Sequence, residues 1–121
     1  MPAESQRVGT AAEAYLAQRL RAAGWRVLAE RFRLRAAEID LIALDPSGVV
    51  VFIEVKARKA GGLVSGVEAV DARKRARLRR AAEVFLLQRP ELRGREVRFD
   101  VVELVRDGGV LRVKTYLPGA F

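Results

Sequence analysis

The fold is decided by the stretch Glu38-Ile39-Asp40-Leu41-Ile42-Ala43-Leu44, the turn Asp45-Pro46-Ser47-Gly48, and Val49-Val50-Val51-Phe52-Ile53-Glu54-Val55-Lys56-Ala57. Two apolar runs separated by a turn with Pro and Gly predict adjacent antiparallel strands over 38–44 and 49–57. Acids and a lysine recur at alternate positions inside these runs. Ionised groups in such places are costly unless they are paired or bound to a metal. The stretch therefore predicts a sheet that also carries a functional site.

The flanking sequence supplies the remaining elements of one domain. Apolar residues at helical spacing (Ala12, Leu16, Leu20, Ala23) predict a helix that ends before Gly24, and a stripe of Leu78, Ala82 and Phe85 predicts a second helix capped by Asp71. The predicted elements are a helix over 6–23, strands over 25–34, 38–44 and 49–57, a Gly-rich mobile loop over 60–69, a helix over 71–88, and strands over 96–104 and 110–117. The order αβββαββ predicts a single α/β domain over 1–121, with a mixed sheet flanked by helices.

Composition limits the chemistry that the chain can perform. Its 121 residues include neither cysteine nor histidine, which excludes Cys- or His-ligated zinc and Ser-His or Cys-His nucleophiles. Carboxylates remain as metal ligands, and they suit hard cations such as Mg²⁺ or Mn²⁺. No apolar run is long enough to span a bilayer and the N-terminal segment does not have the pattern of a signal peptide, so we expect a cytoplasmic protein.

The chain is strongly basic, with a formal net charge of +8. This charge favours nucleic acid as the partner, ahead of an anionic membrane surface. An alternative is that a GC-rich genome or a hot habitat enriched the chain in arginine. The clustering of the basic residues favours a binding role.

Strand register determines whether the acids meet. If Leu44 pairs with Val50, Asp40 lies opposite Glu54, and two carboxylates at that distance repel unless a cation lies between them. The same register places Glu38 opposite Lys56, where the two could simply form a cross-strand ion pair. Exposure of the acids on a solvated face is the other alternative.

The predicted second helix carries a dense run of basic residues. Arg73, Arg77 and Arg80 fall on one face, away from the apolar stripe, and almost no acid interrupts the run. A solvated amphipathic face would have the same pattern. Contact with a polyphosphate would relieve the mutual repulsion of these arginines, with counterion release as the driving force.

Taken together, these motifs resemble the YraN-like family of small bacterial proteins. The resemblance rests on Glu38–Ile42, Phe52–Arg58, Arg98–Val102, Gly9 and Glu13 in the first helix, Lys74 at the start of the second, and the closing Ala120-Phe121. Two positions depart from the family pattern: Ala37 stands where Gly is typical, and Arg31 where Asn is frequent. The alanine suggests either that this turn needs no positive φ or that it is strained.

The family is similar in fold to archaeal Holliday-junction resolvases, within the PD-(D/E)XK nuclease superfamily. The resemblance implies a restriction-endonuclease-like domain in which Asp40 and Glu54 are metal ligands. It also implies that Lys56 is the motif lysine and that Glu13 contributes an acid from the first helix.

The resulting hypothesis is a Mg²⁺- or Mn²⁺-dependent endonuclease that acts on structured or branched DNA. Asp40, Glu54, Lys56 and Glu13 would form its catalytic site, and Glu38 would either join this site or do no more than pair with Lys56. Arg58, Lys74 and the arginines of the basic face would contact phosphates. The alternatives are a binding protein that retains the nuclease fold without turnover, and an adaptor for another protein. A homodimer would suit the symmetry of a junction.

Overall fold

The computed structural model describes residues 4–61 and 71–121, with side chains from residue 11 onward. Its elements, in order, are helix α1 (Glu4–Ala22), strands β1 (Arg26–Arg33), β2 (Glu38–Leu44) and β3 (Val50–Lys59), helix α2 (Ala72–Leu87), the 3-10 turn η1 (Pro90–Leu92), and strands β4 (Val97–Asp107) and β5 (Val110–Leu117). The predicted order αβββαββ is confirmed, and η1 is an addition to it. The predicted loop over 60–69 lies outside the described residues from position 62 onward.

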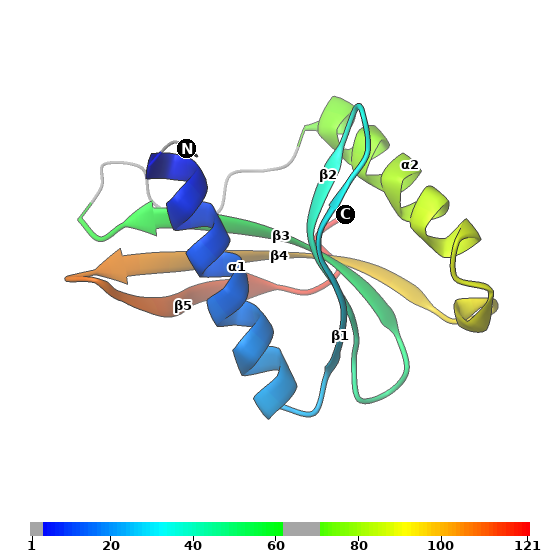
Figure 1. Cartoon of the computed structure of the whole chain (residues 1–121), viewed down its shortest axis with the longest axis horizontal. Helices are drawn as coiled ribbons and strands as arrows, with labels where there is room; N and C mark the ends of the chain where they lie inside the picture. The colour runs from blue at the N-terminus through cyan, green and yellow to red at the C-terminus, as the bar shows by residue number, and fades with distance from the viewer. Residues whose placement is uncertain (1–3, 62–70) are drawn as a thin grey trace.

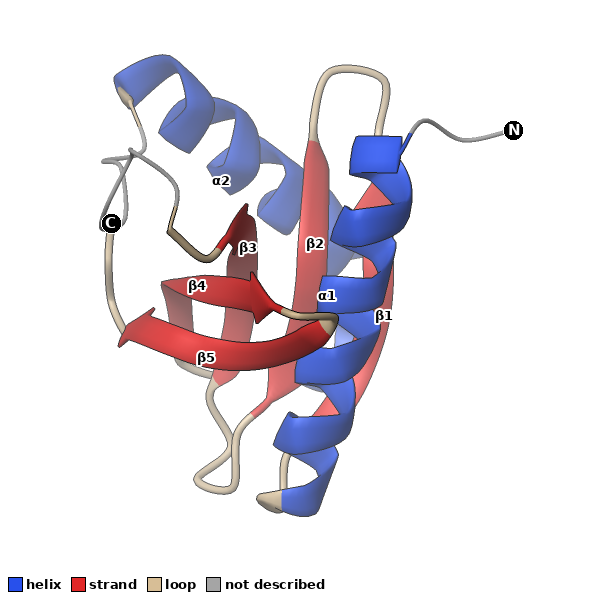
Figure 2. Ribbon diagram, turned by 90° about the vertical axis from the view of Figure 1, so that its left-hand side faces the viewer, coloured by secondary structure: helices blue, strands red, loops and turns tan. Residues whose placement is uncertain are grey.

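The described strands form one mixed sheet in the order β1-β2-β3-β4-β5. β3 and β4 are parallel, and the other neighbours are antiparallel. A parallel pair needs a crossover connection, and α2 lies between β3 and β4 in the chain. In Figure 1, β2 stands between α1 and α2, and Figure 2 shows α1 running along the sheet beside β1 and β2. The predicted mixed sheet with flanking helices is therefore confirmed.

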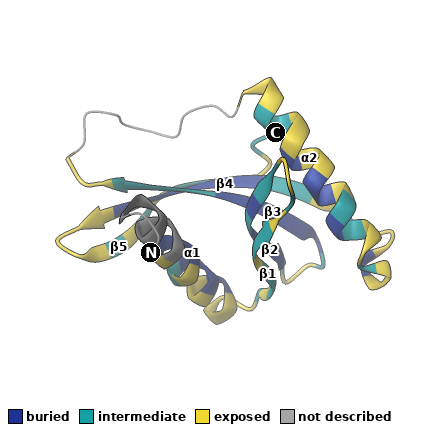
Figure 3. Ribbon diagram, turned by 45° about the horizontal axis from the view of Figure 1, so that its top comes forward, coloured by how far each residue is buried: buried dark blue, intermediate teal, exposed yellow. Residues whose placement is uncertain are grey.

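Each helix covers its own face of the sheet with a separate apolar cluster. On the α1 side, Leu16 and Leu20 pack with Leu41, Ile53 and Val102. The α2 side gathers all five phenylalanines, and its stripe of Leu78, Ala82 and Phe85 is buried as predicted. Ala23, which was predicted to belong to the first stripe, is exposed because α1 ends at Ala22. Figure 3 shows that the buried residues concentrate in the central strands and on the inner sides of the helices.

The register of β2 and β3 is the one predicted from the turn. Leu44 pairs with Val50, and the ladder continues to Leu41 and Ile53, where it ends. Asp45 holds the turn because its Oδ1 accepts the N–H groups of Ser47 (2.9 Å) and Val49 (3.0 Å). Asp40 and Glu54 therefore lie immediately beyond the last backbone pair, where the two strands begin to separate.

A buried carboxylate fixes the chain's end against β4. Asp100 is fully buried and accepts hydrogen bonds from Arg98 Nε (2.8 Å), Tyr116 O–H (2.5 Å) and Gly119 N–H (2.9 Å). Phe121 then stacks on Phe99, with ring centroids 5.0 Å apart. The hydrogen bonds to Asp100 give this residue of the Arg98–Val102 motif a structural role, so no catalytic role is needed to explain it.

The two departures from the family pattern have different backbone consequences. Arg31 has φ 59°, and it is the one non-glycine residue with positive φ among the described residues. Asn adopts this left-handed region more readily than Arg does. Ala37 has no positive φ, so its turn is unstrained there, and its carbonyl accepts the N–H of Leu34 at 2.8 Å.

Candidate metal centre

Three carboxylates from two elements meet beside the separated ends of β2 and β3. Oxygen atoms of Glu13 on α1 and of Glu38 and Asp40 on β2 all lie within 4.8 Å of one another. Glu13 reaches this place because it sits at the edge of the buried stripe of α1, and it is only 5% exposed. We call Glu13, Glu38 and Asp40 the acidic triad.

The triad opens into a cavity of about 450 Å³ between α1, β1, β2, β3 and α2. Basic side chains share this cavity with the acids. Its lining consists of Glu13, Arg31, Ala36, Ala37, Glu38, Asp40, Glu54, Val55, Lys74, Arg77 and Leu78. Acids deep in a cavity with basic groups around them suit a ligand that brings both a cation and a phosphate.

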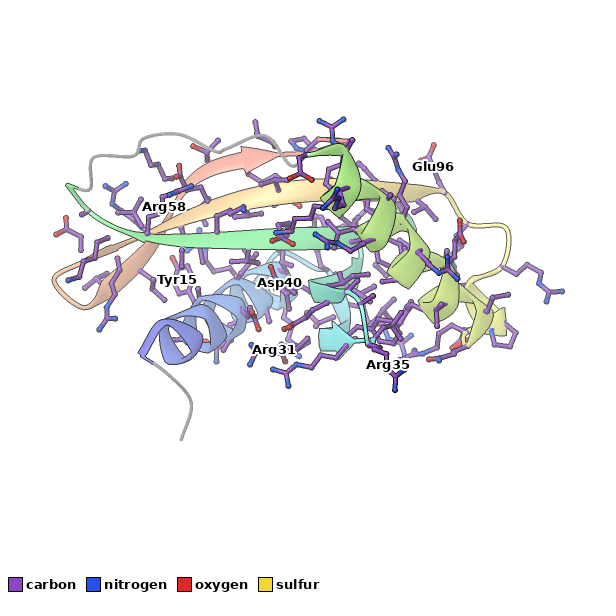
Figure 4. The ribbon with its side chains drawn as sticks, turned by 90° about the horizontal axis from the view of Figure 1, so that it is seen from above. Tyr15, Arg31, Arg35, Asp40, Arg58 and Glu96 are labelled. Atoms are coloured by element: carbon purple, nitrogen blue, oxygen red, sulfur yellow. The ribbon has the colours of Figure 1, made fainter. Side chains whose placement is uncertain are left out.

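Asp40 lies on β2, close to β3 (Figure 4). The N–H of Val55 donates to its Oδ2 at 2.7 Å, which joins the two strands beyond the end of their ladder. Burial, and then the negative charge of Glu54, raises the pKa of Asp40 to about 7, against the lowering effect of the Val55 hydrogen bond. A cation near the other carboxylate oxygen of Asp40 would instead lower this pKa.

Glu13 experiences a similar environment. Burial raises its pKa to about 7, although the charge of Arg31 acts in the opposite direction. Two acids with raised pKa values in one cavity are a common signature of a functional site. Both pKa values are raised by burial and by the negative charge of neighbouring carboxylates. A divalent cation bound between these carboxylates would lower both values.

Glu38 is held by arginines of β1 rather than by a lysine of β3. Its carboxylate lies 3.0 Å from Arg31 Nε and 3.7 Å from Arg33 Nε. The proposed ion pair with Lys56 is therefore wrong: no such pair occurs among the described residues. The reason is that β2 has left β3 by this point, whereas Glu38 still pairs in register with Arg33 of β1.

Glu54 lines the same cavity but does not belong to the triad. Its Oε1 accepts a hydrogen bond from Lys74 Nζ at 2.7 Å. Burial lowers the pKa of Lys74, but the hydrogen bond and charge of Glu54 outweigh that effect and the pKa is raised. Lys74, predicted as a phosphate contact, thus lies inside the cavity as the partner of a predicted metal ligand.

The other predicted basic residues are distributed more widely. Lys56 shares a sheet face with Glu54 but does not line the cavity, and Glu103 is its register partner on β4. Arg58 lies further along β3 (Figure 4), with its Nε 3.2 Å from Glu103 Oε2. On α2, Arg73, Arg77 and Arg80 are exposed, and Arg77 also lines the cavity. Their roles toward phosphate stay predictions.

Arg31 is the site residue that sequence reasoning missed. Its Nε is 3.4 Å from Glu13 Oε2 as well as 3.0 Å from Glu38. The neighbouring pairs, Glu30 with Leu41 and Phe32 with Ile39, place Arg31 across from Asp40. The available signal was the departure from the family pattern at this position, from which no role for the side chain was inferred.

The donor set fits a hard divalent cation. Every acid in the cavity offers carboxylate oxygen, the ligand type that Mg²⁺ and Mn²⁺ prefer. The spacing of the triad's oxygens is compatible with a single ion shared among them. The residues present therefore fit the predicted cofactor class.

Comparisons with known proteins identify relatives along most of the chain. A model of the uncharacterised protein family UPF0102 matches residues 10–104. The chain is 47% identical over 112 residues to a UPF0102 protein of Gloeobacter violaceus, covering 91% of this chain and 88% of the relative. It is 46% identical over 103 residues to a UPF0102 protein of Symbiobacterium thermophilum, covering 83% of each. Neither helix in the described part of the chain is long and apolar enough to cross a membrane.

Proposed function

The chain belongs to the uncharacterised protein family UPF0102, whose YraN-like motifs it carries, and we propose that it is a metal-dependent endonuclease acting on the phosphodiester backbone of structured DNA. The observation that carries this proposal is the meeting of three carboxylates within 4.8 Å in a cavity that Lys74 and Arg77 also line. The proposal includes membership of the PD-(D/E)XK superfamily and a restriction-endonuclease-like fold.

The acidic triad would hold the cation, with Glu54 beside it. A bound Mg²⁺ or Mn²⁺ supplies Lewis acidity and lowers the pKa of a water molecule, which is the chemistry that phosphodiester hydrolysis needs. The N–H of Val55 fixes the orientation of Asp40 through Oδ2, so that the opposite oxygen remains for the cation. Helix α1 brings Glu13 to the site, which makes the ligand set dependent on the tertiary fold.

The basic groups around the cavity would bind the substrate. Lys74, whose Nζ lies 2.7 Å from Glu54 Oε1, would contact a phosphate of the substrate from inside the cavity. Lys56, on the same sheet face as Glu54, would stabilise negative charge on the phosphoryl group. Arg77 and its exposed neighbours on α2 would contact flanking phosphates, which gives affinity without sequence preference.

The alternative is a nucleic-acid binding protein without turnover. It is favoured by one specific observation: Arg31 contacts Glu13 and Glu38, and Lys74 pairs with Glu54. Acids that are paired with the chain's own cations depend less on a metal for stability. The two functions differ in whether a divalent cation binds and whether DNA is cut.

A cleavage assay separates the two functions. The wild-type protein would be incubated in Mg²⁺ or Mn²⁺ with single-stranded, duplex, flapped and four-way-junction DNA, and with RNA. The test variant is Asp40→Ala/Glu54→Ala, and Glu91→Ala, an exposed acid of η1, is the matched control.

The expected result is metal-dependent cleavage of at least one branched substrate, retained in the control and lost in the double variant. Binding of DNA by all three proteins without any product would refute the nuclease and support the binding protein. Failure of the wild type to bind any nucleic acid would eliminate both and leave the protein adaptor. A homodimer would be seen as a doubled mass on the junction in solution.

A further inference from the structure

Arg31 places a positive charge inside the acidic triad. Its Nε lies 3.0 Å from Glu38 Oε1 and 3.4 Å from Glu13 Oε2, so one guanidinium contacts two of the three acids. The side chain is 29% exposed, whereas that of Glu13 is 7% exposed. The charge that a bound cation would supply is thus already provided by the chain in this conformation.

The backbone at Arg31 is strained in a way that the contacts must offset. A φ of 59° is unfavourable for a residue with an ordinary Cβ. The pairs on either side, Glu30 with Leu41 and Phe32 with Ile39, remain in register, so the strain is confined to this residue. Strained residues that persist in folded proteins cluster at functional sites. The ion pairs with Glu13 and Glu38 are among the contacts that hold Arg31 there.

A guanidinium and a divalent cation cannot both occupy the space between these carboxylates. Two positive charges within about 4 Å repel strongly at the edge of a protein interior. Arg, unlike Lys or His, keeps its charge at every pH at which the protein is folded. Deprotonation therefore cannot remove it, and only movement of the side chain can make room for the ion.

We propose that Arg31 is an internal counter-cation that a divalent metal ion must displace from Glu13 and Glu38 before the acidic triad can hold it. This inference rests on the metal site of the proposed function. It adds a regulation of metal binding: without metal, the positive charge of Arg31 occupies the space between the carboxylates. Occupancy by metal then depends on the cation concentration and on how strongly β1 holds Arg31. The neighbouring Arg33 is 61% exposed and lies 3.7 Å from Glu38 alone, so it does not have this role.

Calorimetric titration of the whole protein with Mn²⁺ at pH 8 tests the inference. Arg31→Met removes the charge and Arg31→Lys retains it, while both keep an unbranched side chain at the same backbone position. Arg26→Met, at the end of β1 away from the cavity, is the matched control. We expect Arg31→Met to bind Mn²⁺ at least about tenfold more tightly than wild type, because a competing charge at this distance is worth that or more. Arg31→Lys should be nearer to wild type, and Arg26→Met should lie within about twofold of it.

The outcomes distinguish this inference from the function on which it rests. If wild type binds Mn²⁺ and Arg31→Met binds it equally or more weakly, the counter-cation is refuted and the metal site stands. If neither protein binds Mn²⁺ at millimolar concentration, the metal site itself fails and the inference fails with it. Binding by Arg31→Met alone supports the inference. Arg31→Asn, which suits the positive φ, gives the same readout if the Met variant folds poorly.

Discussion

Replacing Asp40 by Asn should make the metal-free protein more stable, and more so at higher pH. The pKa of Asp40 is raised from 3.8 to about 7, first by burial and then by the charge of Glu54. The folded chain therefore holds this proton more tightly than the unfolded chain does. Between these two values the unfolded state loses its proton first, so the free energy of unfolding decreases as the pH rises.

The magnitude follows from linkage. Each pKa unit is worth about 1.4 kcal/mol, so a fully ionised Asp40 costs on the order of 4 kcal/mol, of which about 2.5 kcal/mol develops between pH 5 and pH 8. Asn has nearly the same shape as Asp, and its carbonyl oxygen can still accept the Val55 N–H that now donates to Oδ2. The variant therefore removes the charge and keeps the contact between β2 and β3.

Urea denaturation at pH 5 and pH 8, with EDTA present, measures this effect. The free energy of unfolding of Asp40→Asn, minus that of wild type, should be larger at pH 8 than at pH 5 by about 2.5 kcal/mol. Equal differences at the two pH values, or an Asn variant that is less stable than wild type at pH 8, would refute the reasoning.

Asp45→Asn provides the control with the opposite sign. Although burial raises the pKa of Asp45, the hydrogen bonds from Ser47 and Val49 lower it overall. A lowered carboxyl pKa contributes stability above the unfolded value, and that stability is lost only as the pH falls through the folded value. Both pH 5 and pH 8 lie above this window. The variant should therefore be less stable than wild type by a similar amount at each pH.

Four further measurements test the metal site, the contacts that stabilise the fold around it, and the basic face of α2. Mn²⁺ affinity should be roughly 100-fold higher at pH 8 than at pH 6, because two triad carboxyls with pKa values of about 7 must lose their protons, and a flat calorimetric profile would contradict those values. Asp71→Ala should lower the free energy of unfolding by about 1 kcal/mol, through loss of the hydrogen bond that caps α2, and an unchanged urea midpoint would argue against that cap. Tyr116→Phe should cost about 2 kcal/mol in the same assay, since it removes one donor from the buried Asp100, whereas a neutral result would mean that the remaining donors suffice. Arg77→Gln should weaken DNA binding and reduce the slope of log affinity against log salt concentration by about 1. Arg26→Gln, at the other end of β1 from the cavity, should leave this slope unchanged. Equal effects of the two substitutions would refute a localised phosphate contact.

Local sequence patterns were sufficient to predict the helices and strands and the register between β2 and β3. The turn from Asp45 to Gly48 restricts how β2 and β3 can pair, because the side-chain period of two allows a single register that buries the apolar residues. Asp71 and the stripe of α2 are equally local, since a cap and a helical period depend on neighbours in the sequence. These features were predicted correctly because their causes lie within a few residues.

The partners of the charged side chains were not predictable in the same way. Glu38 was placed opposite Lys56 of β3, with an ion pair between them as one alternative. It pairs instead with Arg31 and Arg33 of β1, because the β2–β3 ladder ends before Glu38 is reached. Lys74 was grouped with the phosphate-binding residues but contacts Glu54, twenty positions earlier in the chain. Long flexible side chains can reach several partners, and only the packing of whole elements selects among them.

The sequence by itself determined the order of helices and strands, the mixed sheet, and the presence of isolated acids on its central strands. Those follow from hydrophobic periodicity and turn chemistry, which act over short distances along the chain. Only the tertiary structure decided that Glu38, rather than Glu54, completes the acidic triad with Glu13 and Asp40, and that Arg31 contacts this triad at a positive φ. The physical reason is that this charge cluster forms where a helix and strands from distant parts of the chain pack together. The distances between its positive and negative groups are set by that packing, and no local sequence pattern encodes them.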